Sequence, residues 1–184
     1  MTTPWIIPPD LWAGETVAVL GAGPDLEAQL VDLSRDMPTI ACNRSVMLAP
    51  WATVFVGLDP GHPFWGNSAD FKGMKVIGVL EPDMPDALYA GMFYETVHIA
   101  PGHTIQIRNN ALAAIRIAAM AGAAKIILLG FDCAAYEAAH AHTGFYGLTQ
   151  GLEQITAELR AKGIEVERVD STKQVKAKRG NRPA

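Results

Sequence analysis

The fold is decided by a stretch near the N-terminus that reads VAVLGAGPDL at positions 17–26. An apolar, β-branched run stops at a glycine turn, and Pro24 then suits the first turn of a helix. A strand, a glycine turn and a helix in this order are typical of a parallel α/β sheet. Glycines let a ligand approach the backbone closely, and free backbone amides at such a turn favour a phosphate. The stretch therefore also predicts a ligand site at Gly21, Ala22, Gly23 and Pro24.

Short β-rich apolar runs alternate with helical patterns along the rest of the chain. Strands are predicted at 16–20, 39–42, 53–57, 75–79, 96–100, 125–129 and 165–169. Apolar residues recur every three or four positions at 25–35, 110–121 and 149–162, where we expect helices. The sequence thus predicts a single Rossmann-like α/β domain, with a mostly parallel sheet of about six or seven strands and helices on both faces.

The size and composition fit one folded domain. The chain has 184 residues, of which 49% are hydrophobic and 18% charged. We place the domain at 16–170, after a proline-containing lead-in at 1–15 that is expected to be extended, and before a basic tail at 171–184 that is expected to be disordered. The sequence shows no membrane span and no secretory signal, so a cytoplasmic protein is expected. The two cysteines, Cys42 and Cys133, are interpreted as buried structural thiols.

The charge distribution argues against nucleic acid as the main partner. The formal net charge is −4, from 15 basic and 19 acidic residues. Five of the basic residues lie in the last twelve positions, which hold no acid, so the rest of the chain is clearly acidic. Since nucleic-acid binding needs a basic face, the tail alone is suited to it. Aromatic stretches at 63–65 and 92–94 fit either a homo-oligomer interface or a pocket wall.

Polar residues follow two further strands. Asn43 and Arg44 come directly after the strand at 39–42, and Asp59 follows the strand at 53–57. The carboxamide of Asn43 suits a nucleobase edge or a ribose, Arg44 suits a phosphate, and Asp59 suits a ribose or a metal ion. Each of them alone is more typical of a turn or a helix cap than of a binding site. Successive polar strand ends at one edge of a parallel sheet nevertheless predict a binding site.

The glycine turn departs from two known phosphate motifs. A dinucleotide fingerprint needs a third glycine where this chain has Glu27 or Ala28, and a P-loop needs a lysine, so neither NAD nor a Walker-type site is supported. Asp25 suits a helix cap, but its carboxylate would repel a phosphate placed on the same amides. Asn109 and Asn110 open the helix predicted at 110–121, where they fit either an anion site or a plain N-cap.

Acid–base groups follow the strand predicted at 125–129. Asp132 comes directly after it, and His140, His142 and Tyr146 lie in the next irregular stretch. Such side chains can exchange protons with a substrate hydroxyl or orient it. The His-x-His spacing permits a metal, but without a further ligand it does not predict structural zinc.

These motifs together resemble a known superfamily. They are GAGPDL at 21–26, CNR at 42–44, GLD at 57–59, NNA at 109–111, GAAKIILLGFD at 122–132 and HAHTG at 140–144. The superfamily groups archaeal 6-hydroxymethylpterin diphosphokinase-like proteins with bacterial sialyltransferases of glycosyltransferase family 42, and it includes many short phage proteins. In the sialyltransferases the turn usually reads Gly-x-Gly-Pro-Ser-Leu, so Asp25 here replaces a serine, and their C-terminal helical lid has no counterpart in this chain.

The resemblance implies a group transferase that binds a nucleotide or nucleotide-sugar across the strand ends. Carried over by motif, the residues beside the nucleotide are Gly21, Gly23 and Pro24 at a phosphate or ribose, Asn43 at the ribose or base, and Asn110 at the phosphate. The family's catalytic histidine and tyrosines fall in the region of His140, His142, Tyr136 and Tyr146.

Two reactions follow from the resemblance. In glycosyl transfer, His140 or His142 deprotonates an acceptor hydroxyl while Tyr146 steadies the departing phosphate. In diphosphoryl transfer, Asp59 and Asp132 hold magnesium between phosphates. A rival from another class is a non-catalytic module that binds or senses a nucleotide, and NAD-dependent oxidoreduction is weakened by the incomplete glycine pattern.

Overall fold

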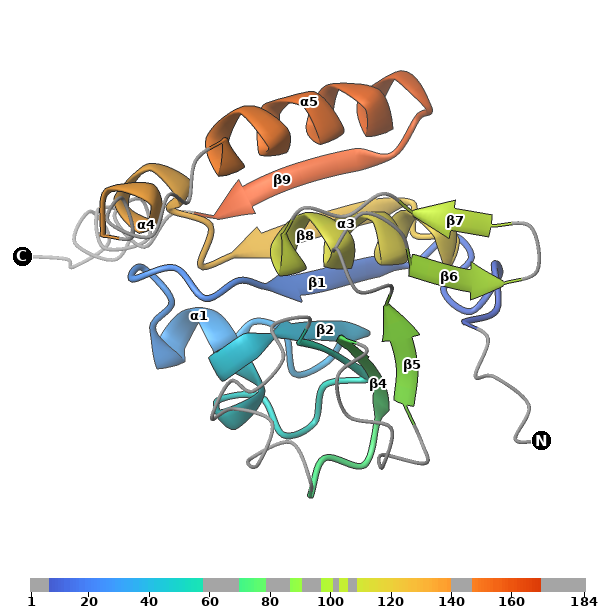
Figure 1. Ribbon diagram of the computed structural model, residues 1–184, viewed down its shortest axis with the longest axis horizontal. Helices are drawn as coiled ribbons and strands as arrows, with labels where there is room; N and C mark the ends of the chain where they lie inside the picture. Colours follow the sequence, from blue (N-terminus) through green and yellow to red (C-terminus); the bar gives the residue numbers. More distant parts are fainter. Residues whose placement is uncertain are drawn as a thin grey trace, which may run out of the picture.

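The computed structural model describes residues 7–57, 70–78, 87–90, 97–100, 103–105, 109–139 and 147–169. In this part of the chain nine strands form one sheet, in the order β7-β6-β5-β4-β3-β2-β1-β8-β9 (Figure 1). The neighbouring strands from β5 to β9 in this order pair in parallel, and β6 and β7 add an antiparallel edge. The strands are β1 (Thr16–Leu20), β2 (Thr39–Cys42), β3 (Val54–Gly57), β4 (Met74–Gly78), β5 (Ala87–Ala90), β6 (Val97–Ala100), β7 (His103–Ile105), β8 (Lys125–Leu129) and β9 (Glu165–Val169).

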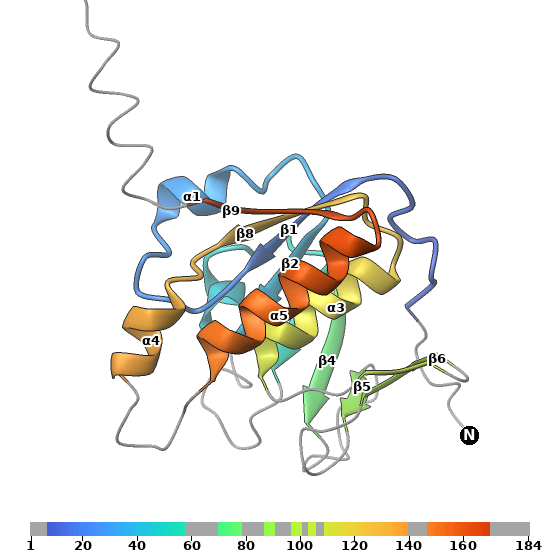
Figure 2. The same cartoon turned by 90° about the horizontal axis from the view of Figure 1, so that it is seen from above.

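Helices cover both faces of the sheet. Helices α3 (Asn110–Met120) and α5 (Leu148–Ala161) lie side by side over one face, and α1 (Ala28–Asp32) and the 3-10 helix η1 (Asn43–Met47) cover the other (Figure 2). Helix α4 (Cys133–Ala139) stands at the carboxyl end of β8 (Figure 1). The predicted Rossmann-like α/β class is therefore confirmed.

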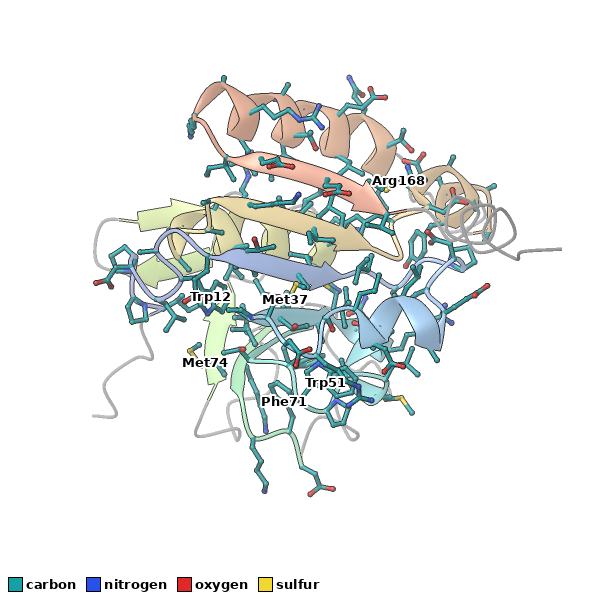
Figure 3. The ribbon with its side chains drawn as sticks, turned by 180° about the vertical axis from the view of Figure 1, so that it is seen from behind. Trp12, Met37, Trp51, Phe71, Met74 and Arg168 are labelled. Carbon is teal, nitrogen blue, oxygen red and sulfur yellow. The ribbon has the colours of Figure 1, made fainter. Side chains whose placement is uncertain are left out.

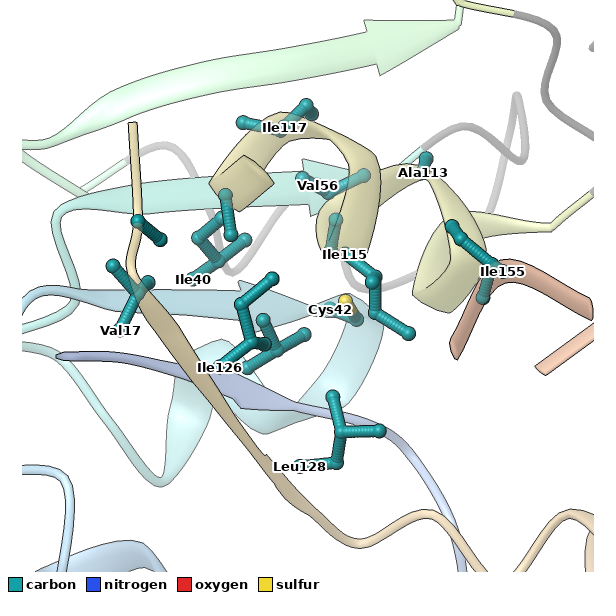
Figure 4. Close-up of a cluster of buried hydrophobic side chains, with 14 of the residues drawn as sticks. Val17, Ile40, Cys42, Val56, Ala113, Ile115, Ile117, Ile126, Leu128 and Ile155 are labelled. Carbon is teal, nitrogen blue, oxygen red and sulfur yellow. The ribbon is translucent and has the colours of Figure 1, made fainter. Parts of the chain in front are cut away.

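The apolar core is divided by the sheet into two clusters. In β2, Ile40 and Cys42 point to the α3 face while Ala41 points to the other, and β1, β3 and β8 divide their side chains in the same way. Figure 4 shows the larger cluster, in which Ile115 of α3 and Ile155 of α5 meet the strands. On the opposite face Trp51 and Phe71 belong to the smaller cluster (Figure 3). Burial on both faces explains why these strands are continuous apolar runs.

Most predicted elements are confirmed. The strands at 16–20, 39–42, 125–129 and 165–169 have the predicted bounds, and the other three are shifted or shortened by one residue. The sequence reading missed β5, β7, η1 and α4. Helix α4 was missed because Cys133 is its one buried residue, so it shows no apolar periodicity.

The first helix is shorter than predicted. We expected it at 25–35, and α1 spans five residues, Ala28–Asp32. After it the amides of Leu33, Ser34 and Arg35 donate to carbonyls three residues earlier, so the segment continues as tight turns. Pro24 and Asp25 thus lie in the loop before the helix.

The expected extended lead-in is wrong for its described part. Residues 9–14 form turns, and the Leu11 amide donates to the Pro8 carbonyl. The Trp12 amide donates to the carbonyl of Ala121 at 2.7 Å, just after α3. Ile7 and Trp12 are 2% and 3% exposed, so their apolar surface holds the lead-in against the core at the amino edge of the sheet (Figure 3).

Three further predictions lie outside the described residues: the aromatic stretches at 63–65 and 92–94 and the basic tail at 171–184. None of the described helices combines the length and apolar character that crossing a membrane requires.

Candidate functional site

A cleft opens where the chain changes direction across the sheet. From β1 the chain runs outward through β2 to β5, and later returns to the other side of β1 as β8. Ligands of open α/β folds bind at the carboxyl ends of strands at such a switch point. The cleft has about 370 Å³ of empty space, including the part that opens to solvent. It is lined by Gly21, Ala22, Gly23, Cys42, Asn43, Asn109, Asn110, Ala111, Gly130, Phe131, Asp132, Cys133, Tyr136 and Leu148.

Two predicted residues meet at one wall of this cleft. Asn43 begins η1 directly after β2, and Asn110 begins α3. Nδ2 of Asn110 donates a 2.6 Å hydrogen bond to Oδ1 of Asn43, and Asn110 is 7% exposed. With its oxygen accepting, the Asn43 carboxamide retains its own N–H groups as donors.

The backbone at Asn43 is also unusual. Its φ is 50°, and among the described residues it is the one non-glycine with a positive φ. Asparagine adopts this left-handed conformation more readily than other side chains. The turn aims Asn43 at the Asn110 side chain, and the Cys42 thiol donates to the Asn110 carbonyl at 3.7 Å. The strand end is therefore fixed to the start of α3.

Asn109 has a clear structural role. Its Oδ1 accepts a 2.7 Å hydrogen bond from the Ala111 amide, so it is the N-cap of α3. The plain reading that it caps the helix is confirmed. Arg44 joins η1 to the glycine turn, because its Nη2 donates to the carbonyls of Ala22 and Gly23 at 3.2 and 3.4 Å.

The glycines of the turn are explained by packing against β8. A Cβ at Gly21 would lie 2.4 Å from the Gly130 carbonyl oxygen, and one at Gly23 would lie 2.5 Å from the same atom. The Gly21 amide donates to Leu129 O at 2.8 Å, and the Gly23 amide to Gly130 O at 3.0 Å. Both amides have acceptors within the protein, and phosphate contact at this turn stays a prediction.

The two aspartates at the switch point hold the backbone. Oδ1 of Asp25 accepts from the Asp132 amide at 3.0 Å, so Asp25 ties the turn to β8 and does not cap α1, whose N-cap is Glu27. Oδ1 of Asp132 accepts from the Ala135 amide at 3.1 Å and caps the start of α4. A catalytic or metal-binding role for Asp132 stays a prediction.

The other predicted catalytic groups, His140, His142 and Tyr146, and the predicted ribose or metal ligand Asp59 lie outside the described residues. Within the described part, no three or more His, Cys, Asp or Glu side chains gather as a metal would require.

Both cysteines are free and buried, which confirms that each is a thiol within the core. Burial raises the pKa of Cys42 far above its ordinary value and raises the pKa of Cys133 to about 11. Since the thiolate is the nucleophile, neither is poised for nucleophilic catalysis at neutral pH.

Sequence reasoning missed a clamp beside the cleft. The Thr149 hydroxyl donates to Glu137 Oε2 at 2.8 Å, and the Thr149 amide donates to Oε1 at 3.1 Å. These bonds hold the pKa of the Glu137 carboxyl below its ordinary value. They join α4 to the first turn of α5. Glu137 therefore holds the end of α4 close to the start of α5, the two helices that flank residues 140–146 in the sequence. Residues 12 apart carry no local signal for such a bond.

The fold and the cleft together define a Rossmann-like α/β domain with a candidate site at its switch point. No protein-family model matches the chain, and no curated protein matches it.

Proposed function

We propose that this protein is a nucleotide- or nucleotide-sugar-dependent group transferase that binds its donor in the cleft at the carboxyl ends of β1, β2 and β8. The single observation that carries the proposal is the hydrogen bond between Asn43 and Asn110, which brings two separately predicted residues to one wall of the cleft at the switch point.

The chemistry of this wall suits a nucleotide. A carboxamide both donates and accepts, as a nucleobase edge or a ribose hydroxyl requires. Asn110 is almost fully buried and pairs with Asn43, so the wall is fixed before a ligand arrives, which lowers the entropy cost of binding.

The reaction has two versions. In glycosyl transfer, an acceptor oxygen bonds to the anomeric carbon, the bond from that carbon to the nucleotide phosphate breaks, and His140 or His142 takes the acceptor proton while Tyr146 steadies the phosphate. In diphosphoryl transfer, an acceptor oxygen bonds to the β-phosphorus of a nucleoside triphosphate, the bond from that phosphorus to the oxygen of the α-phosphate breaks, the nucleoside monophosphate leaves, and the acceptor proton passes to solvent; Asp59 and Asp132 would hold magnesium on the phosphates. Survival of activity in EDTA would count against the magnesium version.

A second candidate is a module that binds a nucleotide without turning it over. It is favoured by the structural roles of the polar groups around the cleft, since Asp132 caps α4, Asn109 caps α3 and Asp25 holds the turn. Its signature would be tight binding without product, unchanged in the variants His140→Ala and His142→Ala.

The proposal is tested by a thermal-shift screen with CMP, CDP, UDP, GDP, ADP, ATP, CMP-sialic acid and NAD, with and without magnesium. A ligand present at a concentration of a hundred times its Kd adds about 2.7 kcal/mol to the unfolding free energy. For a chain of this size that raises Tm by about 5–10 °C. The variants Asn43→Gly and Asn110→Ala should lose the shift, and Gln154→Ala, which removes an exposed amide on α5, should keep it. No shift with any compound would overturn the proposal.

A further inference from the structure

The described lining of the cleft carries little positive charge. It includes no lysine, arginine or histidine among the described residues, and its ionisable side chains are Cys42, Asp132, Cys133 and Tyr136. Burial raises the pKa of both thiols above the ordinary value, so both stay protonated at neutral pH. Asp132 thus brings a negative charge to the lining. A phosphate placed deep in the cleft would meet a like charge without a lining cation to balance it.

In the described part of the chain, positive charge lies beside the cleft and not in its lining. Arg44 holds the outer side of the glycine turn through the carbonyls of Ala22 and Gly23. Arg168, near the carboxyl end of β9 (Figure 3), slightly opposes the effect of burial on Cys133. An anion that stays at the mouth of the cleft can reach the Arg44 side, because one Nη2 atom uses only part of the five-donor guanidinium.

Five backbone amides of the lining already have acceptors within the protein. Those of Gly21, Gly23 and Cys133 donate to backbone carbonyls at 2.8, 3.0 and 2.8 Å, and those of Ala111 and Asp132 donate to side-chain oxygens at 2.7 and 3.0 Å. A phosphate that used any of them would have to displace an existing hydrogen bond.

What the lining offers is apolar surface and neutral carboxamides. Ala111, Phe131 and Leu148 supply apolar contacts, and Asn43 supplies amide donors. We infer that the cleft receives the uncharged nucleoside part of the nucleotide, its heterocycle and ribose, while the phosphates stay at the mouth beside Arg44. This inference rests on the proposed function, in the version without magnesium at Asp132, and specifies which part of the ligand the cleft recognises.

The test is isothermal titration calorimetry of the intact chain with cytidine, uridine, adenosine and guanosine and with their 5′-diphosphates, in EDTA and at about 0.15 M salt. We expect the Kd of one nucleoside to lie within about tenfold of the Kd of its diphosphate, because salt screens exposed phosphate contacts and they add little affinity. Asn43→Gly should lower the affinity for the nucleoside and the affinity for the diphosphate equally, by about tenfold. It removes the side chain without straining the positive φ.

Arg44→Ala should weaken binding of the diphosphate by at least about threefold more than binding of the nucleoside, whose change reports the loss of the two bonds from Arg44 to the glycine turn. Arg35→Ala removes a positive charge from an exposed position before β2 and should change neither affinity. A diphosphate that binds more than about a hundredfold tighter than its nucleoside, or an Asn43→Gly variant that weakens the diphosphate alone, would overturn the inference and leave the proposed function standing. Binding of neither class would overturn both.

Discussion

Replacing Gly21 with alanine tests whether packing alone requires a glycine at the end of β1. The new Cβ would lie 2.4 Å from the Gly130 carbonyl oxygen and 3.1 Å from the Phe131 ring. Since Cβ contacts below 3.0 Å are essentially never seen, the loop must retreat from β8 by at least about 0.6 Å. That movement lengthens the hydrogen bonds from the Gly21 and Gly23 amides. Overpacking of this kind costs about 1–3 kcal/mol of unfolding free energy.

The measurement is urea unfolding without any ligand, followed by circular dichroism. Gly14→Ala is the matched control, because its Cβ would meet nothing within 4 Å and its φ of 78° imposes backbone strain alone, about 1–2 kcal/mol. The far-UV spectrum of both variants should stay that of the folded protein. If the unfolding free energy of Gly21→Ala differs from that of the original protein by less than about 0.5 kcal/mol, packing does not require the glycine, and our explanation of the turn is refuted.

Three other changes have defined outcomes. Trp12→Ala should lower the unfolding free energy by about 3–5 kcal/mol, because it empties a buried site under the lead-in; a loss below about 1 kcal/mol in urea unfolding would contradict this packing. The thiols of Cys42 and Cys133 should react with a thiol reagent far more slowly in the folded protein than in urea, because they are buried and protonated. Rapid labelling of the folded protein at mildly alkaline pH would show instead that they are accessible. Glu137→Gln should destabilise the protein at neutral pH. The pKa of the Glu137 carboxyl is lower in the folded protein than in the unfolded chain, so this carboxylate stabilises the fold fully above its unfolded-state pKa and loses that effect as the pH falls through its folded-state pKa. The unfolding free energies of the original protein and the variant should therefore become equal in acid. A difference in unfolding free energy that does not shrink there would contradict the clamp to Thr149.

The central strands were predictable because burial on both faces leaves an unambiguous sequence signal. In β2 and β8 nearly every position is apolar, and a glycine, a proline or a polar residue marks where each run ends. Elements that bury little carry little signal. Helix α4 buries one residue, Cys133, and so shows no apolar periodicity. Strand β7 has three residues, too few for an alternating pattern to be recognised.

The site was predictable as a set of residue types but not as a set of contacts. Asn43 and Asn110 were both predicted from their places at a strand end and a helix start. Their hydrogen bond crosses 67 residues, and so depends on sheet order. The bond from the Asp132 amide to Asp25 crosses 107 residues and turns a predicted helix cap into a link between β1 and β8. Such roles follow from tertiary structure alone.

The central claim, that the cleft at the switch point binds a nucleotide, is tested most directly by amide chemical shifts. A ¹⁵N-labelled sample is titrated with the compound that gives the largest thermal shift. The account predicts changes concentrated at 21–23, 43–44, 109–111 and 130–133, and their loss in Asn43→Gly. Changes confined to other surfaces, such as the β9 edge at 165–168, or the same changes in the Asn43→Gly variant, would contradict it.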